Sequence, residues 1–169
     1  LLTKEKIDFV LSIQYPWILS KDFLNLCSYR VLNLHNARLP DYRGHNTISH
    51  EILNNEKTHV STLHWIEEEV DRGRAIMTKS IKIKDTDTAY SLWLRSVDSA
   101  VALLDDFLKD TKKFLSKEIS EKVLAGGKFY SKNGIKKLKH IRSGASFEEI
   151  DRISRAFWFP PHEPAYFIK

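Results

Sequence analysis

Runs of apolar residues along the first part of the chain predict a strand, a helix and a second strand. Residues 7–13 are almost continuously apolar, which is typical of a strand buried on both faces of a parallel sheet. After the turn at Tyr15-Pro16, an amphipathic helix is expected over residues 21–27, and a second buried strand begins at Val31. This strand–helix–strand unit predicts an α/β fold with a mostly parallel sheet flanked by helices.

The middle of the chain continues with helices and strands. The pattern predicts a helix over residues 47–54, strands over residues 58–66 and 75–83, and a long helix that Asp87-Thr88 begins. On this long helix, apolar residues recur every three or four positions and mark the face expected in the core: Ala89, Leu92, Trp93, Val97, Ala100, Val101 and Leu104.

The two ends of the chain carry further expectations. A buried first strand needs neighbours on both sides and only one is evident, so we expect another part of the sheet to precede Leu1. Near the other end, a short helix is expected over residues 147–153. The aromatic stretch 157–161 and the apolar end 166–168 predict a β-hairpin that packs against either a second subunit or a ligand.

Composition indicates one main soluble domain. The chain has 169 residues, of which 42% are hydrophobic, so folding can bury about two thirds of its surface in one core. No run approaches the roughly 20 apolar residues of a membrane span, and the first residues lack a basic region followed by an apolar run, so we expect a soluble protein that is not exported. The single cysteine, Cys27, has no disulfide partner and is interpreted as a core residue of a cytoplasmic protein. We divide the chain into a core over residues 1–115 and a C-terminal extension over residues 116–169.

A formal charge of +5 favours anionic partners, a condition that nucleic acids, phosphorylated metabolites and polyglutamylated cofactors all meet. Much of the excess lies in one late segment, which is also compatible with a solvated face: Lys132, Lys136, Lys137, Lys139 and Arg142. Aromatic residues are not interleaved with these cations as base-stacking platforms, which argues against nucleic acid.

Candidate chemistry begins at Asn33 and His35, two polar residues at the end of the second apolar strand. Their spacing of two places both side chains on one face of the strand. Ligands of open α/β sheets bind at the carboxyl ends of the strands, so this pair stands where a site is expected. The alternative is a histidine whose ring is satisfied by a nearby carbonyl.

A second polar element follows later in the chain. Thr62 and His64 lie on a predicted strand, and the acidic turn Glu69-Val70-Asp71-Arg72-Gly73 comes next. Together the two elements resemble the formyltransferase family that uses 10-formyltetrahydrofolate. Its members carry an Asn-x-His strand end, a Leu-Pro-x-Tyr-Arg-Gly loop and a later Asp-x-Gly, matched here by residues 33–35, 39–44 and 71–73.

The resemblance extends over roughly residues 7–108 and implies a Rossmann-like core. Residues 14–20 are similar to the family's strand and loop ending in Ile-Leu-Pro, with Ser20 in place of the proline. By resemblance, the catalytic residues are Asn33, His35 and Asp71, and the co-substrate is 10-formyltetrahydrofolate. The family's pterin contacts correspond to Trp17, Ile18, Leu19, Glu69 and Val70; the alternative is that Trp17 and Ile18 only cover the end of the sheet.

The chemistry of formyl transfer agrees with these three residues. The reaction passes through a tetrahedral carbon bearing an oxyanion, and one well-placed donor such as the amide of Asn33 or an N–H of His35 contributes about 3 kcal/mol. Histidine side chains change charge near neutral pH, so His35 can carry a proton while Asp71 holds the ring. The scheme requires no metal, and the other histidines of this region lack a carboxylate at ligand spacing: His45, His50 and His64.

The amine that accepts the formyl group is suggested by the loops and the tail. Relatives act on glycinamide ribonucleotide, methionyl-tRNA or sugar nucleotides, and residues 42–47, 127–130 and 157–166 resemble the corresponding parts of the sugar enzymes. This resemblance favours a dTDP-linked amino-dideoxy sugar, a precursor of lipopolysaccharide O-antigen or another surface glycan. The residues expected at the substrate are Tyr42, Arg43, Gly44, His45, Asn46, Trp158 and Tyr166.

Relatives also dimerise through the aromatic end, which predicts a homodimer. Three alternatives to a sugar N-formyltransferase stay open. They are transfer to methionyl-tRNA, hydrolysis of formyl-folate by a deformylase, and a non-catalytic fragment that binds sugar nucleotides.

Overall fold

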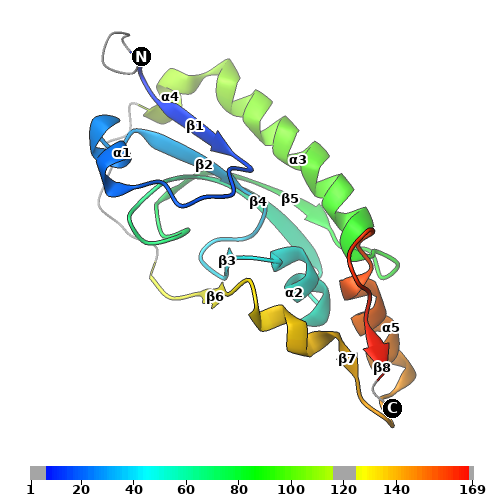
Figure 1. Ribbon diagram of the computed structural model, residues 1–169. Helices are drawn as coiled ribbons and strands as arrows, with labels where there is room; N and C mark the ends of the chain where they lie inside the picture. Colours follow the sequence, from blue (N-terminus) through cyan, green and yellow to red (C-terminus); the bar gives the residue numbers. More distant parts are fainter. Residues whose placement is uncertain (1–6, 116–124, 168–169) are drawn as a thin grey trace.

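The computed structural model of the chain describes residues 7–115 and 125–167 (Figure 1). The strands are β1 (Val10–Ile13), β2 (Val31–His35), β3 (Tyr42–Gly44), β4 (Thr58–Trp65), β5 (Ala75–Lys82), β6 (Lys128–Tyr130), β7 (His140–Ile141) and β8 (Tyr166–Phe167). The helices are α1 (Lys21–Leu26), α2 (Thr47–Leu53), α3 (Ala89–Lys109), α4 (Thr111–Leu115), a 3-10 helix (Gly134–Lys139) and α5 (Phe147–Phe157). Two predictions fall partly outside the described residues. The predicted extension begins with residues 116–124, and the predicted hairpin includes residue 168.

The main sheet has the strand order β1-β2-β4-β5. β1 and β2 are parallel and are joined through α1, which confirms the predicted α/β class and its strand–helix–strand unit. The sheet as described is mixed, because β4 is antiparallel to both β2 and β5. Parallel pairing needs a crossover of about a dozen residues or more, and the loop 66–74 between β4 and β5 is too short to provide one.

The two faces of the sheet differ in polarity. Helix α3 runs along one face (Figure 1), where an apolar cluster contains Leu32, Leu34, Leu63, Trp65, Ala100, Leu103 and Phe107. Successive side chains of a strand point to opposite faces, so Asn33 and His35 lie on the face opposite α3. The alternation that builds the core therefore also separates the polar residues from it.

Helix α3 begins where the sequence predicts. The Thr88 hydroxyl accepts the N–H of Ser91 and the Ser91 hydroxyl accepts the N–H of Thr88, which together form a capping box. Leu92 is fully buried, as expected, whereas Val101 is 60% exposed. Val101 was expected in the core, but Ala100 and Leu103 already occupy the buried stripe and leave it on the solvent side.

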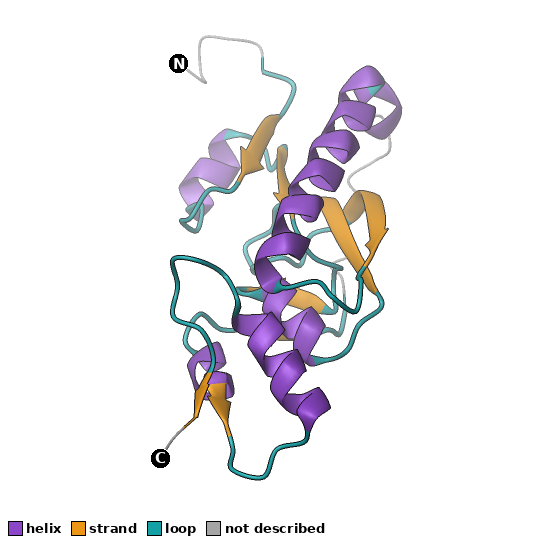
Figure 2. Cartoon of the chain, turned by 90° about the vertical axis from the view of Figure 1, so that its right-hand side faces the viewer, coloured by secondary structure: helices purple, strands orange, loops and turns teal. Residues whose placement is uncertain are grey.

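The C-terminal region differs from the expected hairpin. Helix α5 extends to Phe157, four residues beyond the predicted end, and packs with α2 and the start of α3 in a second apolar cluster. β8 then pairs in parallel with β7, and α5 lies between them in the sequence (Figure 2). The hairpin prediction is wrong for the described residues, because Phe157 ends α5, residues 158–161 form no strand, and β8 pairs with β7 instead.

A second small sheet was also not foreseen. β3, predicted as part of a loop, pairs in parallel with β6, and Tyr42 and Tyr130 stack with ring centroids 5.4 Å apart. Three-residue strands carry too little pattern to be recognised in a sequence. Among the helices of the described residues, none combines the length and apolar character needed to cross a membrane.

Candidate active site

The polar face of the sheet collects side chains where β2 ends. The antiparallel register places Asn33 opposite His64 and His35 opposite Thr62. Because paired residues of neighbouring strands share a face, all four side chains lie opposite α3. The site predicted from the end of β2 thus includes part of β4.

Asp71 approaches this cluster from the loop between β4 and β5. Its backbone has a φ of 55°, in the left-handed region that aspartate tolerates better than most residues. Gly73 allows the loop to approach the sheet closely, because the Cβ of any other residue there would lie 1.8 Å from the carbonyl oxygen of Trp65. The Asp71 carboxylate accepts the N–H of Gly44 at 2.9 Å, which ties the loop to β3.

The imidazole of His35 lies between a carbonyl and a carboxylate. Its Nε2 is 2.9 Å from the carbonyl oxygen of Tyr42, and since a carbonyl only accepts, Nε2 carries a proton. Its Nδ1 is 3.7 Å from Oδ2 of Asp71, and the two side chains are 12% and 10% exposed. Nδ1 is therefore the ring atom that can gain or lose a proton without breaking the bond to Tyr42.

His64 orients the amide of Asn33. The Nδ1 of His64 donates to the carbonyl oxygen of Trp65 at 2.7 Å, and its Nε2 lies 3.2 Å from Nδ2 of Asn33. Burial, followed by the nearby charge of His35, lowers the pKa of His64 to about 4. A neutral ring with its proton on Nδ1 can only accept at Nε2, so the Asn33 amide must direct an N–H toward it.

The sequence places His64 in the second polar element and argues against a zinc site there, but it gives His64 no role in catalysis. Its alternation with Leu63 and Trp65 was visible there, but its pairing opposite Asn33 required the register of β2 and β4. Its Nε2 also lies 3.7 Å from Oδ1 of Asp71. We interpret this distance as proximity rather than as an ion pair, because the low pKa keeps His64 neutral at pH 7.

The residues expected at the folate lie at the same edge of the sheet. β1 and β2 are parallel, so the loop after β1 begins beside the end of β2. In this loop Trp17 and Ile18 are 72% and 79% exposed, and Leu19 is half-buried. An ion pair of 2.8 Å between Lys21 and Glu68 connects the start of α1 with the loop after β4.

The other two residues expected at the folate lie in that second loop. Val70 is half-buried, and Glu69 is exposed. The Glu69 carboxylate accepts from Arg72 at 2.8 Å and from Arg43 at 3.3 Å. These contacts, led by the hydrogen bond from Arg72, lower the pKa of Glu69 and keep it charged.

The substrate residues expected in β3 are mostly engaged with the protein. The Tyr42 hydroxyl donates to Glu56 at 2.8 Å, and burial raises its pKa. The side chain of Arg43 is buried and directed to Glu69, so it is not free to meet a phosphate. The contribution of Gly44 comes from its backbone N–H, which binds Asp71.

The remaining expected substrate residues separate into two places. His45 is exposed and donates its backbone N–H to Tyr130 at 2.8 Å, and Asn46 caps α2 with a φ of 55°. Trp158 directly follows α5 and Tyr166 lies on β8, and both elements are at the end of the molecule away from β1 (Figures 1 and 2). The ring of Tyr166 stacks on His140, with centroids 6.3 Å apart. The structure therefore brings together the three expected catalytic residues, while these two aromatics stand apart from them.

Residues 1–107 match the formyl transferase family, and the chain belongs to this family. The match spans both parts of the site, the end of β2 and the loop that carries Asp71. It confirms the family resemblance seen in the sequence. Within the part of the chain that the structure describes, no group of three or more histidine, cysteine, aspartate or glutamate side chains is arranged to hold a metal ion.

Three similar proteins show what the chain resembles. GDP-perosamine N-formyltransferase from Brucella melitensis is 30% identical, over 94% of this chain and 60% of its own length. A 4-N formyltransferase from Francisella tularensis superimposes with a TM-score of 0.82 at 20% identity, covering 96% of this chain and 66% of that one. WlaRD, a sugar 3N-formyl transferase crystallised with dTDP and 5-N-formyl-THF, gives a TM-score of 0.73 at 25% identity, covering 89% and 54%. The chain thus spans about 60% of the length of the curated relative.

Proposed function

We propose that this chain carries the catalytic site of a folate-dependent N-formyltransferase, which moves a formyl group from 10-formyltetrahydrofolate to the amine of a nucleotide-linked amino sugar. The observation that carries the proposal is the convergence of Asn33, His35 and Asp71 at one edge of the sheet, with Asp71 3.7 Å from the ring of His35. An amide donor, a proton carrier and a carboxylate are the groups that acyl transfer to an amine needs.

We assign a role to each of these groups. One N–H of the Asn33 amide binds His64, and we assign the second to the formyl oxygen, on which negative charge develops. The amine nitrogen bonds to the formyl carbon, and the bond from that carbon to N10 breaks. Nδ1 of His35 accepts the proton that the amine loses and passes it to N10, while Asp71 stabilises the protonated ring.

The donor is assigned to the surface formed by the loop after β1 and the loop after β4. Exposed Trp17 and Ile18 offer apolar area to a flat pterin, and the backbone near Val70 offers hydrogen-bonding groups. The presence of 5-N-formyl-THF with WlaRD supports a folate co-substrate for this chain as well.

The acceptor is assigned by similarity to the sugar enzymes, two of which are named for GDP-perosamine and for a sugar 3-amine. Within this class we propose a dTDP-linked amino-dideoxy sugar that serves a surface glycan such as O-antigen, modified in the cytoplasm. We also propose a homodimer, because exposed Trp158, Tyr166 and Phe167 lie near the C-terminal end as a surface for a second subunit.

One assay tests the proposed function. The protein is incubated with 10-formyltetrahydrofolate and a panel of amino-sugar nucleotides that differ in base and amine position, and each product is weighed by mass spectrometry. We expect one acceptor to gain the mass of one formyl group. Release of tetrahydrofolate without any acceptor would indicate a deformylase instead, and formylation of methionyl-tRNA alone would indicate the tRNA branch.

A further inference from the structure

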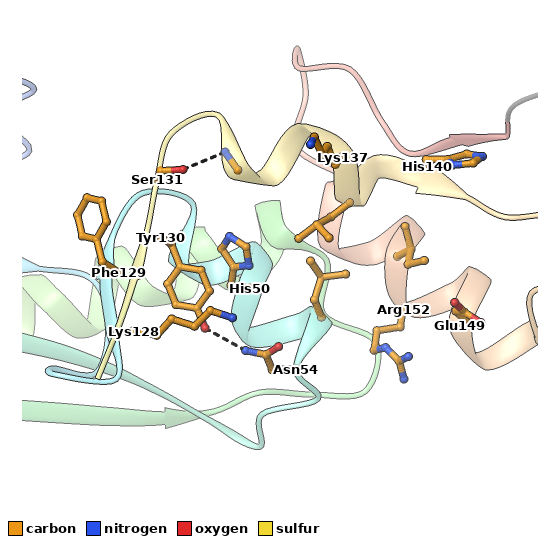
Figure 3. Close-up of a pocket in the computed structure, with 14 residues that line it drawn as sticks. His50, Asn54, Lys128, Phe129, Tyr130, Ser131, Lys137, His140, Glu149 and Arg152 are labelled. Atoms are coloured by element: carbon orange, nitrogen blue, oxygen red, sulfur yellow. Dashed lines mark hydrogen bonds between the residues drawn. The ribbon is translucent and has the colours of Figure 1, made fainter. Parts of the chain in front are cut away.

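A cavity of about 600 Å³ lies between α2, β6, the 3-10 helix and α5 (Figure 3). None of the residues expected at the substrate lines it. Its walls include the stacked rings of His50 and Tyr130, whose centroids are 3.9 Å apart. Three cationic side chains line it from three different elements: Lys128 on β6, Lys137 on the 3-10 helix and Arg152 on α5 (Figure 3).

The charge balance of this cavity is positive. Within residues 7–115 and 125–167, none of its three cationic side chains forms an ion pair. The acidic lining residue Glu149 is already paired with Arg142 at 3.1 Å. Unpaired cations around a concave surface attract a compact anion, and phosphate groups suit both the planar fork of arginine and the point charge of lysine.

The cavity adjoins the catalytic cluster through β3 and β6. Gly44 is paired with Tyr130 in this small sheet, and the same Gly44 donates its N–H to Asp71. Neighbouring strands lie about 4.8 Å apart, so the wall of the cavity is one strand spacing from the strand that holds the catalytic carboxylate. A ligand anchored in the cavity can therefore extend a second group toward the site.

We propose that this cavity binds the diphosphate of the sugar nucleotide, with Lys128, Lys137 and Arg152 as its cationic contacts. The inference rests on the proposed function, because it takes the formyl acceptor to be nucleotide-linked. Arg43, which was expected at the substrate, does not compete for this role, since it is buried against Glu69. The sugar then lies between the cavity and His35, with its amine toward the formyl group.

The test is a titration of the whole chain with dTDP, UDP, GDP and inorganic pyrophosphate, followed by calorimetry, with uncharged thymidine for comparison. The variants are Lys137→Ala, Arg152→Ala and a matched control, Lys136→Ala, which removes an exposed lysine from the same 3-10 helix outside the cavity. Loss of one charge-assisted contact weakens binding by about tenfold. We expect this loss in the first two variants, no change in the control, and retention of part of the affinity in Arg152→Lys.

Turnover separates this inference from the proposed function. In Lys137→Ala and Arg152→Ala we expect the KM for an amino-sugar nucleotide to rise with little change in kcat, because the diphosphate is bound equally before and during the reaction. Equal affinity for diphosphates in all variants, or an unchanged KM, overturns the cavity assignment and leaves formyl transfer intact. Charge-dependent diphosphate binding without formylation of any amino sugar overturns the function and keeps the cavity.

Discussion

Two histidine–carboxylate pairs in this protein use the same chemical groups in opposite ways. In the candidate active site, His35 and Asp71 are 3.7 Å apart and about a tenth exposed. Between α2 and β4, His59 and Glu51 are 2.7 Å apart, and neither side chain is more than 1% exposed. The first pair leaves room for a proton to move and for a substrate to enter, whereas the second excludes both. Access and spacing, not residue type, mark the pair suited to catalysis.

The sealed pair has a structural role that suits its position. Burial raises the pKa of Glu51, and the hydrogen bond from His59 opposes that rise. Oε1 of Glu51 and Nε2 of His59 are buried without a hydrogen-bond partner among the described residues. Two groups left partly unsatisfied gain most from their bond to each other, which fixes α2 against β4. Because α2 follows β3 directly, this contact also helps to hold β3 beside the active site.

The largest expected effect breaks the open pair. His35→Ala and Asp71→Asn should each lower kcat by about 10²- to 10⁴-fold, because the first removes the proton carrier and the second its stabilising charge. The formyl-transfer rate on the acceptor identified by mass measures this loss. Thermal unfolding provides the control, and the melting temperature should change little. Either variant turning over at nearly the normal rate would refute the mechanism.

The sealed pair should respond in the opposite manner. Glu51→Ala leaves His59 buried without its partner, so the free energy of unfolding should fall by about 3 to 5 kcal/mol. Urea denaturation measures this change, and kcat of the folded fraction should stay within a few-fold of the normal value. A matched exposed substitution, Asp105→Ala, should leave stability nearly unchanged. A stable Glu51→Ala protein with much reduced turnover would mean that this pair belongs to the site.

The sequence predicted the parts of the fold that have a strong period. The apolar run at β2 and the stripe of α3 identified their elements because burial repeats along them. The pairing of β8 with β7 could not be foreseen, because two-residue strands have no period. The partner of Tyr166 is also distant in the sequence, since His140 lies 26 residues earlier. The end of α5 was placed too early because Phe157 was assigned to the aromatic stretch that follows, although Ile150, Ile153 and Phe157 continue a helical spacing of three and four.

The site was predictable as residues but not as contacts. Asn33, His35 and Asp71 could be named because they stand in motifs at loop and strand ends. The carbonyl of Tyr42 accepts the hydrogen bond from His35, and because it is a backbone group, the residue type does not indicate it. The role of His64 depends on the strand register, and the cationic cavity depends on how three distant segments pack.

A third prediction concerns the buried histidines, which sharpen the contrast with His35. Burial is the main cause that lowers the pKa values of both His50 and His64 from 6.5 to about 4. Between these pH values the unfolded chain binds protons that the folded chain does not. The contribution of the two neutral histidines to the free energy of unfolding is therefore fully present above about pH 6.5 and is lost as the pH falls to about 4. The loss is about 3 kcal/mol for each histidine.

Urea denaturation at several pH values between 4 and 6.5 measures how steeply the free energy of unfolding falls as the pH is lowered. In His50→Gln the free energy of unfolding should fall less steeply with pH, by the contribution of one histidine. A change in stability that is the same at every pH does not affect this comparison. Comparison with this variant also removes the contribution of Glu51, whose raised pKa acts in the opposite direction. An identical slope in His50→Gln and the unaltered protein would show that His50 is not held neutral by burial.

The smallest expected effect concerns His64, which is as buried as His59 but belongs to the open site. If its neutral ring only orients Asn33, His64→Leu should lower kcat by about tenfold, the cost of one misdirected donor, with little change in the KM for either substrate. His64→Gln supplies an acceptor oxygen and should restore part of the rate. The acidic limb of the pH–rate profile should not move, because a group with a pKa near 4 is already neutral where the enzyme works. A shifted limb would instead place His64 itself in the proton path.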